Sequence, residues 1–142
     1  MENLYVIVVG CGRLGRVLAN RLSAIGHQVV VVDRDSSRFS RLSAEFSGFT
    51  VEGDAVELSV LHRAGIEEAD CLLAATDKDN VNLMVAQVAR NIFDVQSVIA
   101  RVFDPAHADI YRQFEVATIS PTRLSEEVFL EVMAEQFGEA VR

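Results

Sequence analysis

The sequence has few of the features that mark secreted or metal-binding proteins. It contains only two cysteines, Cys11 and Cys71, which are 60 residues apart and lie inside apolar stretches. This spacing supports neither a disulfide framework nor a cysteine-based zinc site. The low cysteine content fits a reducing cytosol, because disulfides persist in oxidising compartments.

Basic residues and long apolar runs are also scarce. Thirteen Lys and Arg stand against 21 Asp and Glu, a net charge of −8, and nucleic-acid binders instead carry a basic face. We therefore expect no nucleic-acid partner. The N-terminus has no basic region, and no apolar run approaches the ~18 residues of a membrane span. These absences predict a soluble protein that reaches a membrane only through a partner.

The length and composition are those of one folded domain. The chain has 142 residues, of which 50% are hydrophobic and 24% charged. A domain of this size buries about 68–70% of the surface of its unfolded chain, so it needs no covalent staples. It shows no internal repeat and no low-complexity segment.

Short apolar runs alternate with segments of helical periodicity along the whole chain, which predicts βαβ units and a parallel sheet covered on both faces. The predicted strands are 4–9, 28–32, 49–52, 71–75, 97–102 and 116–119. The predicted helices are 13–25, 36–46, 58–64, 79–91, one that begins at Pro105, and one that follows Pro121. The fold class is therefore α/β, a Rossmann-like doubly wound parallel sheet of six strands.

A glycine-rich loop links the first strand to the first helix. Residues 10–15 read Gly-Cys-Gly-Arg-Leu-Gly, a complete G-x-G-x-x-G in the context that gives this motif its meaning. We expect Gly10 to allow the tight turn, Gly12 to let the backbone approach a pyrophosphate, and Gly15 to permit close helix packing. The helix N-terminus, which includes Leu14, would supply N–H donors to the phosphates.

An acidic residue follows the second strand at the spacing expected for a ribose ligand. Asp33 lies 23 residues after Gly10, near the ~20-residue offset of dinucleotide-binding domains. Its carboxylate would accept hydrogen bonds from the ribose hydroxyls and repel a 2′-phosphate, which favours NAD(H) or a simple adenine nucleotide over NADP(H). Arg34 beside it leaves NADP(H) open.

Two arginines and a cysteine accompany the glycine loop. We expect Arg13 to reach a phosphate and Arg16 to lie along the surface. Helix-start geometry could lower the pKa of Cys11, although a small residue tolerated at a variable position is the simpler interpretation.

Other strand ends point toward the same crevice, because ligands of doubly wound sheets bind at the carboxyl ends of the strands. Asp54 and Ala55 follow the third strand, and Asp54 would accept a hydrogen bond from the adenine amino group. Ala75 and Thr76 end the fourth strand and leave room for a nucleotide. Ordinary turn and capping roles remain the alternative. Arg101 lies in an apolar strand, where its charge needs an anion or solvent.

The last segment, 121–142, forms a second region after the domain of residues 1–120. Its apolar residues recur along an otherwise acidic helix. It either covers the last face of the sheet or projects to pack on a partner subunit.

The chain lacks the parts that an enzyme needs. About 20 residues remain after the sixth predicted strand, too few for a substrate domain, and neither G-x-S-x-G nor a P-loop occurs. We identify no catalytic residue and no metal-ligand set. The sequence favours a nucleotide-binding module over the alternative, a fragment of an NAD-dependent oxidoreductase without its substrate domain.

Residues 4–120 resemble a known family. The segments VIVVGCGRLGRVLANRL, VVVVDRD, VEGDAVELSVLHRAGIEEADCLLAATDKDNVNLMVAQVAR and VIARVFDP closely resemble the RCK N-terminal (KTN or TrkA-N) domain of Trk/Ktr potassium transport regulatory subunits and ligand-gated potassium channels. The resemblance implies a cytoplasmic regulatory module, peripheral to the inner face of the membrane. It implies homodimers or higher rings that couple NAD(H) or ATP/ADP binding to gating of a membrane potassium transporter or channel.

The resemblance also implies site residues at matching positions. It implies that Gly10, Gly12 and Gly15 hold the phosphates, that Asp33 binds the ribose and that Asp54 binds the adenine. It also implies that Ala75 and Thr76 line the pocket, and that Arg101 lies near the phosphates or at the dimer contact. The terminal helix resembles the helix that crosses to the neighbouring subunit. Family subunits usually carry a following C-terminal domain, so this sequence is either a stand-alone module or a fragment of a longer subunit.

Overall fold

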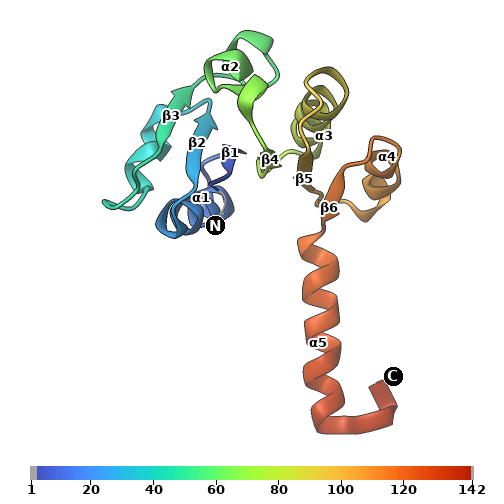
Figure 1. The fold of residues 1–142 in the computed structure, drawn as a ribbon. Helices are drawn as coiled ribbons and strands as arrows, with labels where there is room; N and C mark the ends of the chain where they lie inside the picture. Colours follow the sequence, from blue (N-terminus) through green and yellow to red (C-terminus); the bar gives the residue numbers. More distant parts are fainter. Residues whose placement is uncertain (1–2, 142) are drawn as a thin grey trace.

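The computed structural model describes residues 3–141 and contains a six-stranded parallel sheet in the order β3-β2-β1-β4-β5-β6 (Figure 1). All five strand pairs are parallel. The strands are β1 (Tyr5–Val9), β2 (Gln28–Asp33), β3 (Phe49–Glu52), β4 (Cys71–Ala74), β5 (Ser97–Arg101) and β6 (Ala117–Ile119). The order reverses between β1 and β4, so the predicted Rossmann-like class is confirmed, with strand bounds that shift by a residue or less.

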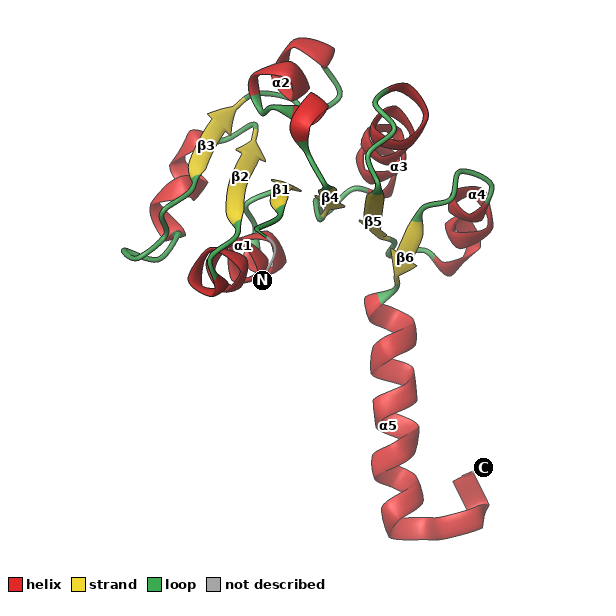
Figure 2. Ribbon diagram, in the orientation of Figure 1, coloured by secondary structure: helices red, strands yellow, loops and turns green. Residues whose placement is uncertain are grey.

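The central strands are buried because helices cover both faces. Helix α1 (Arg13–Ile25) and the 3₁₀ helix η1 (Ser36–Arg41) lie on one face, whereas α2 (Leu58–Arg63), α3 (Asp79–Gln87) and α4 (Ala108–Arg112) lie on the other (Figure 2). Alternate residues of β1 divide between two cores: Val6 and Val8 face α1, and Ile7 and Val9 face α2 and α3. Such burial on both sides explains the unbroken valine runs.

The helix predicted for 36–46 is wrong in type and length. The chain forms only η1, which Asp35 begins by accepting a hydrogen bond from Ser37 N at 3.0 Å. Ser43 N then bonds to Asn20 Oδ1 of α1 at 3.0 Å instead of continuing a helix. Serines favour such local bonds over helix interiors, and the segment is rich in them.

The helix predicted for 79–91 forms as two parts. Helix α3 ends at Gln87, and a π-helical segment, η3, continues over Val88–Ile92. The 3₁₀ segment η2 (Ile66–Glu68) follows Gly65, and η4 (Pro105–His107) precedes α4 with Pro105 in its first turn, as predicted.

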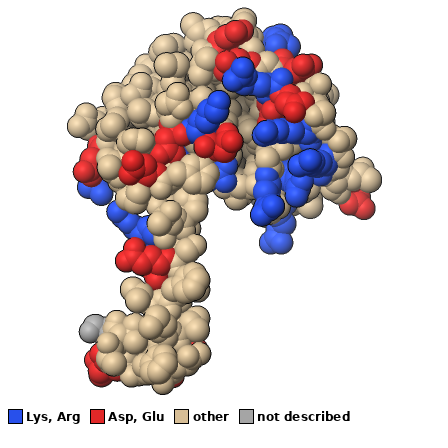
Figure 3. All heavy atoms as spheres, turned by 180° about the vertical axis from the view of Figure 1, so that it is seen from behind, with Lys and Arg blue, Asp and Glu red and all other residues tan. Residues whose placement is uncertain are grey.

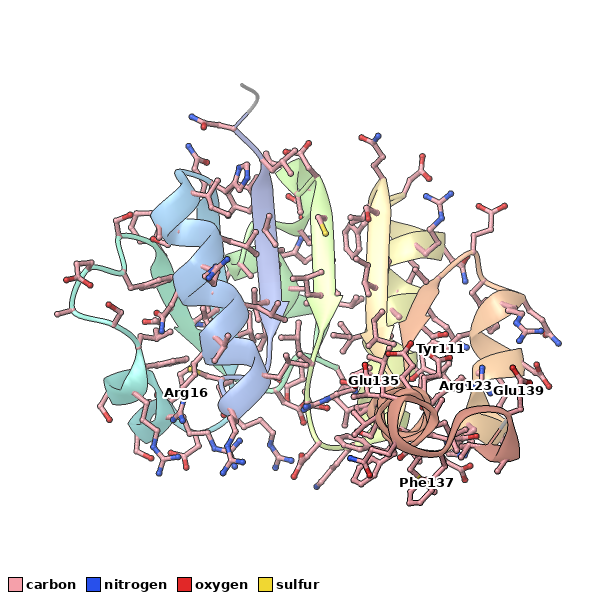
Figure 4. All side chains as sticks on the ribbon, turned by 90° about the horizontal axis from the view of Figure 1, so that it is seen from below. Arg16, Tyr111, Arg123, Glu135, Phe137 and Glu139 are labelled. Carbon is pink, nitrogen blue, oxygen red and sulfur yellow. The ribbon has the colours of Figure 1, made fainter. Side chains whose placement is uncertain are left out.

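Helix α5 (Pro121–Phe137) leaves the domain after β6 and projects on the side of the sheet that carries α1 (Figures 1 and 2). None of its residues is buried. Figure 4 looks along α5 and shows Phe137 on the side turned away from the strands. The possibility that this helix covers the last face of the sheet is therefore wrong. A short 3₁₀ segment, η5 (Gly138–Val141), follows it.

The α1-side face of the sheet stays open beyond β4. The row Leu73, Ile99 and Ala117 continues Val8 across β4, β5 and β6, yet none of these three residues is buried. Ile119, also on this face, is 46% exposed. Among the described residues, strands β5 and β6 are thus covered on one side only. No helix within residues 3–141 has the length and hydropathy of a membrane span.

Candidate functional site

The glycine loop forms the tight turn that its sequence predicts. Gly10 has φ 104°, a left-handed conformation, and a Cβ there would lie 3.0 Å from both Ala75 O and Thr76 N. A Cβ on Gly15 would lie only 1.7 Å from Gly10 O, whereas one on Gly12 would meet nothing within 4 Å. Gly15 therefore serves helix packing, and Gly12 keeps the floor of the crevice open.

The N-terminus of α1 opens toward the crevice with its donors uncapped. Gly12 is its N-cap residue, no side chain caps it, and its first turn holds no acidic residue. The free N–H groups and the helix dipole favour an anion at this point. The side chain of Leu14 is not part of the crevice lining, so Leu14 would contribute through its backbone only.

Asp33 lies at the end of β2, next to the glycine loop, and is 8% exposed. Its Oδ2 accepts a hydrogen bond from Cys11 N at 2.7 Å, and its Oδ1 accepts one from Asp35 N at 2.8 Å. Arg38 Nη1 lies 3.7 Å from the same carboxylate. Asp33 thus ties the glycine loop to β2, in addition to facing the position expected for a ribose.

Cys11 lies between the crevice and the α1 core. It is buried, and its Sγ donates to Arg38 O at 3.6 Å. Burial, followed by the nearby Asp33 carboxylate, raises the pKa of this thiol above its ordinary value, although nearby arginines oppose this. Burial thus opposes activation of this thiol, and Cys11 packs in the core on the α1 side of the sheet.

The end of β3 contributes the opposite wall of the crevice. Ala55 is buried, and Asp54 Oδ1 accepts a hydrogen bond from Val56 N at 3.1 Å. Arg34 Nε lies 4.0 Å from Asp54 Oδ2. The Asp54 side chain is 32% exposed. Within residues 3–141, its Oδ2 makes only this long ion pair with Arg34, which a ligand can replace.

A buried amide that the sequence analysis missed fixes the loop after β4. Asn82 of α3 is fully buried, and its Oδ1 accepts hydrogen bonds from Thr76 N at 3.0 Å and Thr76 Oγ1 at 2.7 Å. Its Nδ2 donates to Thr76 O at 3.1 Å and to Arg101 O at 2.9 Å. The signal was present in the sequence, since Asn82 falls in register with Val85 and Ala86 on the buried helix face.

The guanidinium of Arg101 donates hydrogen bonds to backbone carbonyls, which the sequence analysis did not anticipate. Its Nη2 donates to Ala75 O at 2.7 Å and to Thr76 O at 2.9 Å, and its guanidinium lies 4.7 Å from the Phe103 ring centroid. Burial lowers the pKa of Arg101 from its ordinary value, although nearby carboxylates oppose this. Arg101 also lines the crevice, so the expectation that its charge meets an anion or solvent stays a prediction beside these carbonyl contacts.

These elements enclose one crevice of about 910 Å³ at the carboxyl edge of β1, β2 and β4, a size that suits a nucleotide. Eleven of the twelve predicted binding positions lie in or beside it: all but Leu14 and Gly15 contribute to its wall, and Gly15 lies directly behind Gly10. Seven of the 13 Lys and Arg side chains line it, against four Asp. The crevice is thus a basic region on an acidic chain.

The arginines are more numerous than the sequence analysis anticipated. Arg16, expected along the surface, lines the crevice with Arg13, and Arg38 and Arg41 reach it from η1. The wrong helix assignment for 36–46 hid the last two, because a 3₁₀ helix places them differently. No cluster of three potential metal-ligating His, Cys, Asp or Glu side chains occurs within residues 3–141.

A parallel doubly wound sheet with an uncapped helix N-terminus and a glycine-rich loop at its switch point defines a nucleotide-binding domain of the Rossmann type. The family model described as the TrkA-N domain matches residues 6–121. The chain belongs to the TrkA-N domain family.

Curated relatives carry potassium uptake names. The chain is 40% identical over 120 residues to the Trk system potassium uptake protein TrkA of Streptomyces coelicolor, a match that covers 84% of this chain and 54% of that protein. It is 32% identical over 110 residues to a TrkA homolog of Pyrococcus abyssi, covering 78% and 48% respectively. The chain therefore spans about half the length of the curated relatives it matches.

Solved structures agree with the fold. The Kef C-terminal domain of Shewanella denitrificans in its AMP-bound form has a TM-score of 0.79 at 26% identity, covering 95% of this chain and 83% of that one. The TrkA-N domain of the Escherichia coli inner membrane protein ybaL has a TM-score of 0.82 at 21% identity, covering 92% and 97%. The GsuK channel bound to NAD has a TM-score of 0.72 at 23% identity, covering 87% and 22%.

Proposed function

We propose that the chain is the nucleotide-sensing module of a potassium transporter or channel, and that it binds NAD(H) or ATP/ADP in the crevice. The uncapped N-terminus of α1 above the open Gly12 is the observation that carries this proposal. It offers N–H donors and positive potential where a phosphate would lie. Adenine nucleotides in similar domains, AMP in the Kef domain and NAD in the GsuK channel, support the ligand class.

The remaining site residues take the roles that their positions favour. Arg13 would bind phosphate, Asp33 the ribose hydroxyls, and Asp54 the adenine amino group. Ala55, Ala75 and Thr76 would form the wall around the nucleoside. Arg34 would leave its ion pair with Asp54 and contact the ligand instead. Arg101 would act indirectly, by fixing the loop after β4 through its hydrogen bonds to Ala75 O and Thr76 O.

The same proposal assigns α5 to a partner subunit. Apolar side chains along the helix are exposed, led by Phe129 at 71%, Phe137 at 63% and Val128 at 55%. The open α1-side face of β5 and β6 offers apolar surface of the same kind on a second copy. We infer that residues 121–142 pack on a neighbouring subunit, outside the nucleotide-binding domain of residues 1–120, in a homodimer or larger ring.

Nucleotide state would reach the membrane partner through this assembly. A ligand shifts an equilibrium only if it binds one arrangement more tightly than the other. Coupling of about 1–3 kcal/mol is typical of such systems. The module would then act in the cytoplasm, at the inner membrane face, through its transporter. The names of the curated relatives give no support to the oxidoreductase alternative.

Calorimetric titration with NAD⁺, NADH, ATP and ADP tests the nucleotide site. We expect binding that Gly12→Val abolishes, since its side chain would occupy the phosphate position that Gly12 leaves open. Arg21→Gln, on the exposed surface of α1, is the matched control and should bind normally. Absence of binding for all four ligands would contradict the proposal.

A further inference from the structure

The ribose end of the crevice carries a group of arginines that extends beyond the phosphate position. Arg38 and Arg41 come from η1 and Arg16 from the second turn of α1, and all three line the crevice. Figure 3 shows Lys and Arg side chains gathered on the part of the domain farthest from α5, and Figure 4 shows Arg16 at the carboxyl edge of the sheet beside η1. The ribose end is therefore strongly basic.

This positive charge exceeds what a pyrophosphate needs. The N-terminus of α1 and Arg13 already face the pyrophosphate position. Within residues 3–141, no carboxylate lies within 4.0 Å of the guanidinium groups of Arg16 or Arg41. Arg38 lies 3.7 Å from Asp33 and 4.0 Å from Asp35, and it is 46% exposed. Of these three arginines, only Arg38 therefore has carboxylates of the described residues within 4.0 Å, those of Asp33 and Asp35.

Asp33 does not present the bare carboxylate that would exclude a further phosphate. Both of its oxygens accept backbone hydrogen bonds, from Cys11 N and Asp35 N, and its exposed fraction is 8%. Arg38 offsets part of its remaining charge. The repulsion expected from the sequence is therefore weakened by contacts that only the fold creates.

We propose that the crevice accepts an adenine nucleotide whose ribose carries a 2′-phosphate, the NADP(H) class, and that Arg38 and Arg41 bind this phosphate. The inference rests on the proposed function, because it places the adenosine as described above. An arginine near the acidic residue after the second strand is the usual means of accommodating a 2′-phosphate. Arg34, the nearest in sequence, is directed to Asp54, which leaves the η1 arginines for this role.

Three small nucleotides isolate the 2′-phosphate from the rest of a dinucleotide. AMP, adenosine 2′,5′-bisphosphate and adenosine 3′,5′-bisphosphate are titrated calorimetrically into the purified chain at fixed ionic strength, followed by NADH and NADPH. We expect the 2′,5′-bisphosphate to bind at least about tenfold more tightly than AMP, as charge-assisted hydrogen bonds allow. The 3′,5′-isomer should gain less, because its phosphate lies on the other ribose hydroxyl.

The double variant Arg38→Gln/Arg41→Gln should reduce this preference to about onefold; the preference is read as the ratio of the two affinities, so that a general loss of positive charge, which weakens AMP as well, does not count toward it. The substitution at position 38 changes only the side chain, so the contact between Cys11 Sγ and the backbone carbonyl of this residue remains. Thermal unfolding checks that the double variant folds. Arg21→Gln removes one positive charge from α1, two turns beyond Arg13, and should keep the full preference.

The outcomes separate this inference from the proposed function. If AMP and NADH bind but the 2′,5′-bisphosphate binds no better, or if its advantage survives in the double variant, the 2′-phosphate site is overturned and the nucleotide sensor stands. Equal gains for the 2′,5′- and 3′,5′-isomers would mean general attraction of charge and would also overturn it. If no adenine nucleotide binds, both proposals fail.

Discussion

The crevice and helix α5 show opposite relations between side chains and solvent. Around the crevice, short loops close on one another, and within residues 3–141 every buried side-chain nitrogen or oxygen has a hydrogen-bond partner. Along α5, large apolar side chains lie in solvent and none is buried. The first region is complete within one chain, and the second is not. Under the proposed function, this difference predicts that a single chain binds the ligand, whereas transmission of the signal needs an assembly.

The largest effect is expected in the glycine loop, where a substitution should destabilise the crevice without touching α5. Gly15→Ala places a Cβ 1.7 Å from Gly10 O, and backbone there has no room to yield. We expect a loss of about 3 kcal/mol or more in the free energy of unfolding, measured by urea denaturation. Gly12→Ala is the matched control, since its Cβ meets nothing within 4 Å, and should unfold like the original chain. Equal stability of the two variants would contradict the packing role of Gly15.

A charge on α5 should break the assembly and spare the crevice. Phe129→Asp removes the most exposed large side chain of the helix, and a buried aromatic anchor typically contributes about 2 kcal/mol or more to an interface. Analytical ultracentrifugation should show dissociation to monomers that still bind nucleotide. Glu131→Gln, an exposed polar position on the same helix, should leave the assembly intact. A wild-type chain that is already monomeric would refute the assignment of α5 to a partner.

The start of α3, next to the crevice, should show a smaller, pH-dependent effect. Asp79, at the start of α3, accepts hydrogen bonds from Phe103 N, Asp104 N and His107 Nδ1. Burial acts to raise the pKa of Asp79, but these bonds outweigh it and hold the pKa below its ordinary 3.8. A lowered carboxyl pKa stabilises the fold above the unfolded value and loses this contribution as pH falls through the folded value.

Asp79→Asn should therefore cost about 1 kcal/mol near neutral pH, because one acceptor oxygen remains. The difference in melting temperature between the two chains should shrink below about pH 4. The matched variant Asp109→Asn, whose carboxylate is exposed on α4, should show little difference at any pH. A difference for Asp79→Asn that stays constant down to pH 2 would assign its effect to packing instead of charge.

Much of this structure could be predicted because its signals are local. Short apolar runs predicted the six strands, and their alternation with helical periods predicted the parallel arrangement. The positions of Gly10, Gly12 and Asp33 around one crevice followed from the spacing of the motif, in which Gly10 and Gly15 have no room for a side chain and Gly12 leaves the crevice open. The helix predicted for 36–46 failed because its serines and Asn20 of a different helix compete for the same backbone groups.

The sequence by itself determined the six strands, their parallel doubly wound class and the glycine loop after the first strand, because backbone sterics and hydrophobic periodicity act over a few residues. Only the tertiary structure decided how charges are satisfied. It assigned Arg101 to the carbonyls of Ala75 and Thr76, gave each carboxylate oxygen of Asp33 a backbone donor, and brought Arg16, Arg38 and Arg41 to the wall of one crevice. It also directed α5 away from the sheet. These outcomes depend on contacts between segments that are distant in the sequence, because a charged group is compensated by the groups that lie near it in space.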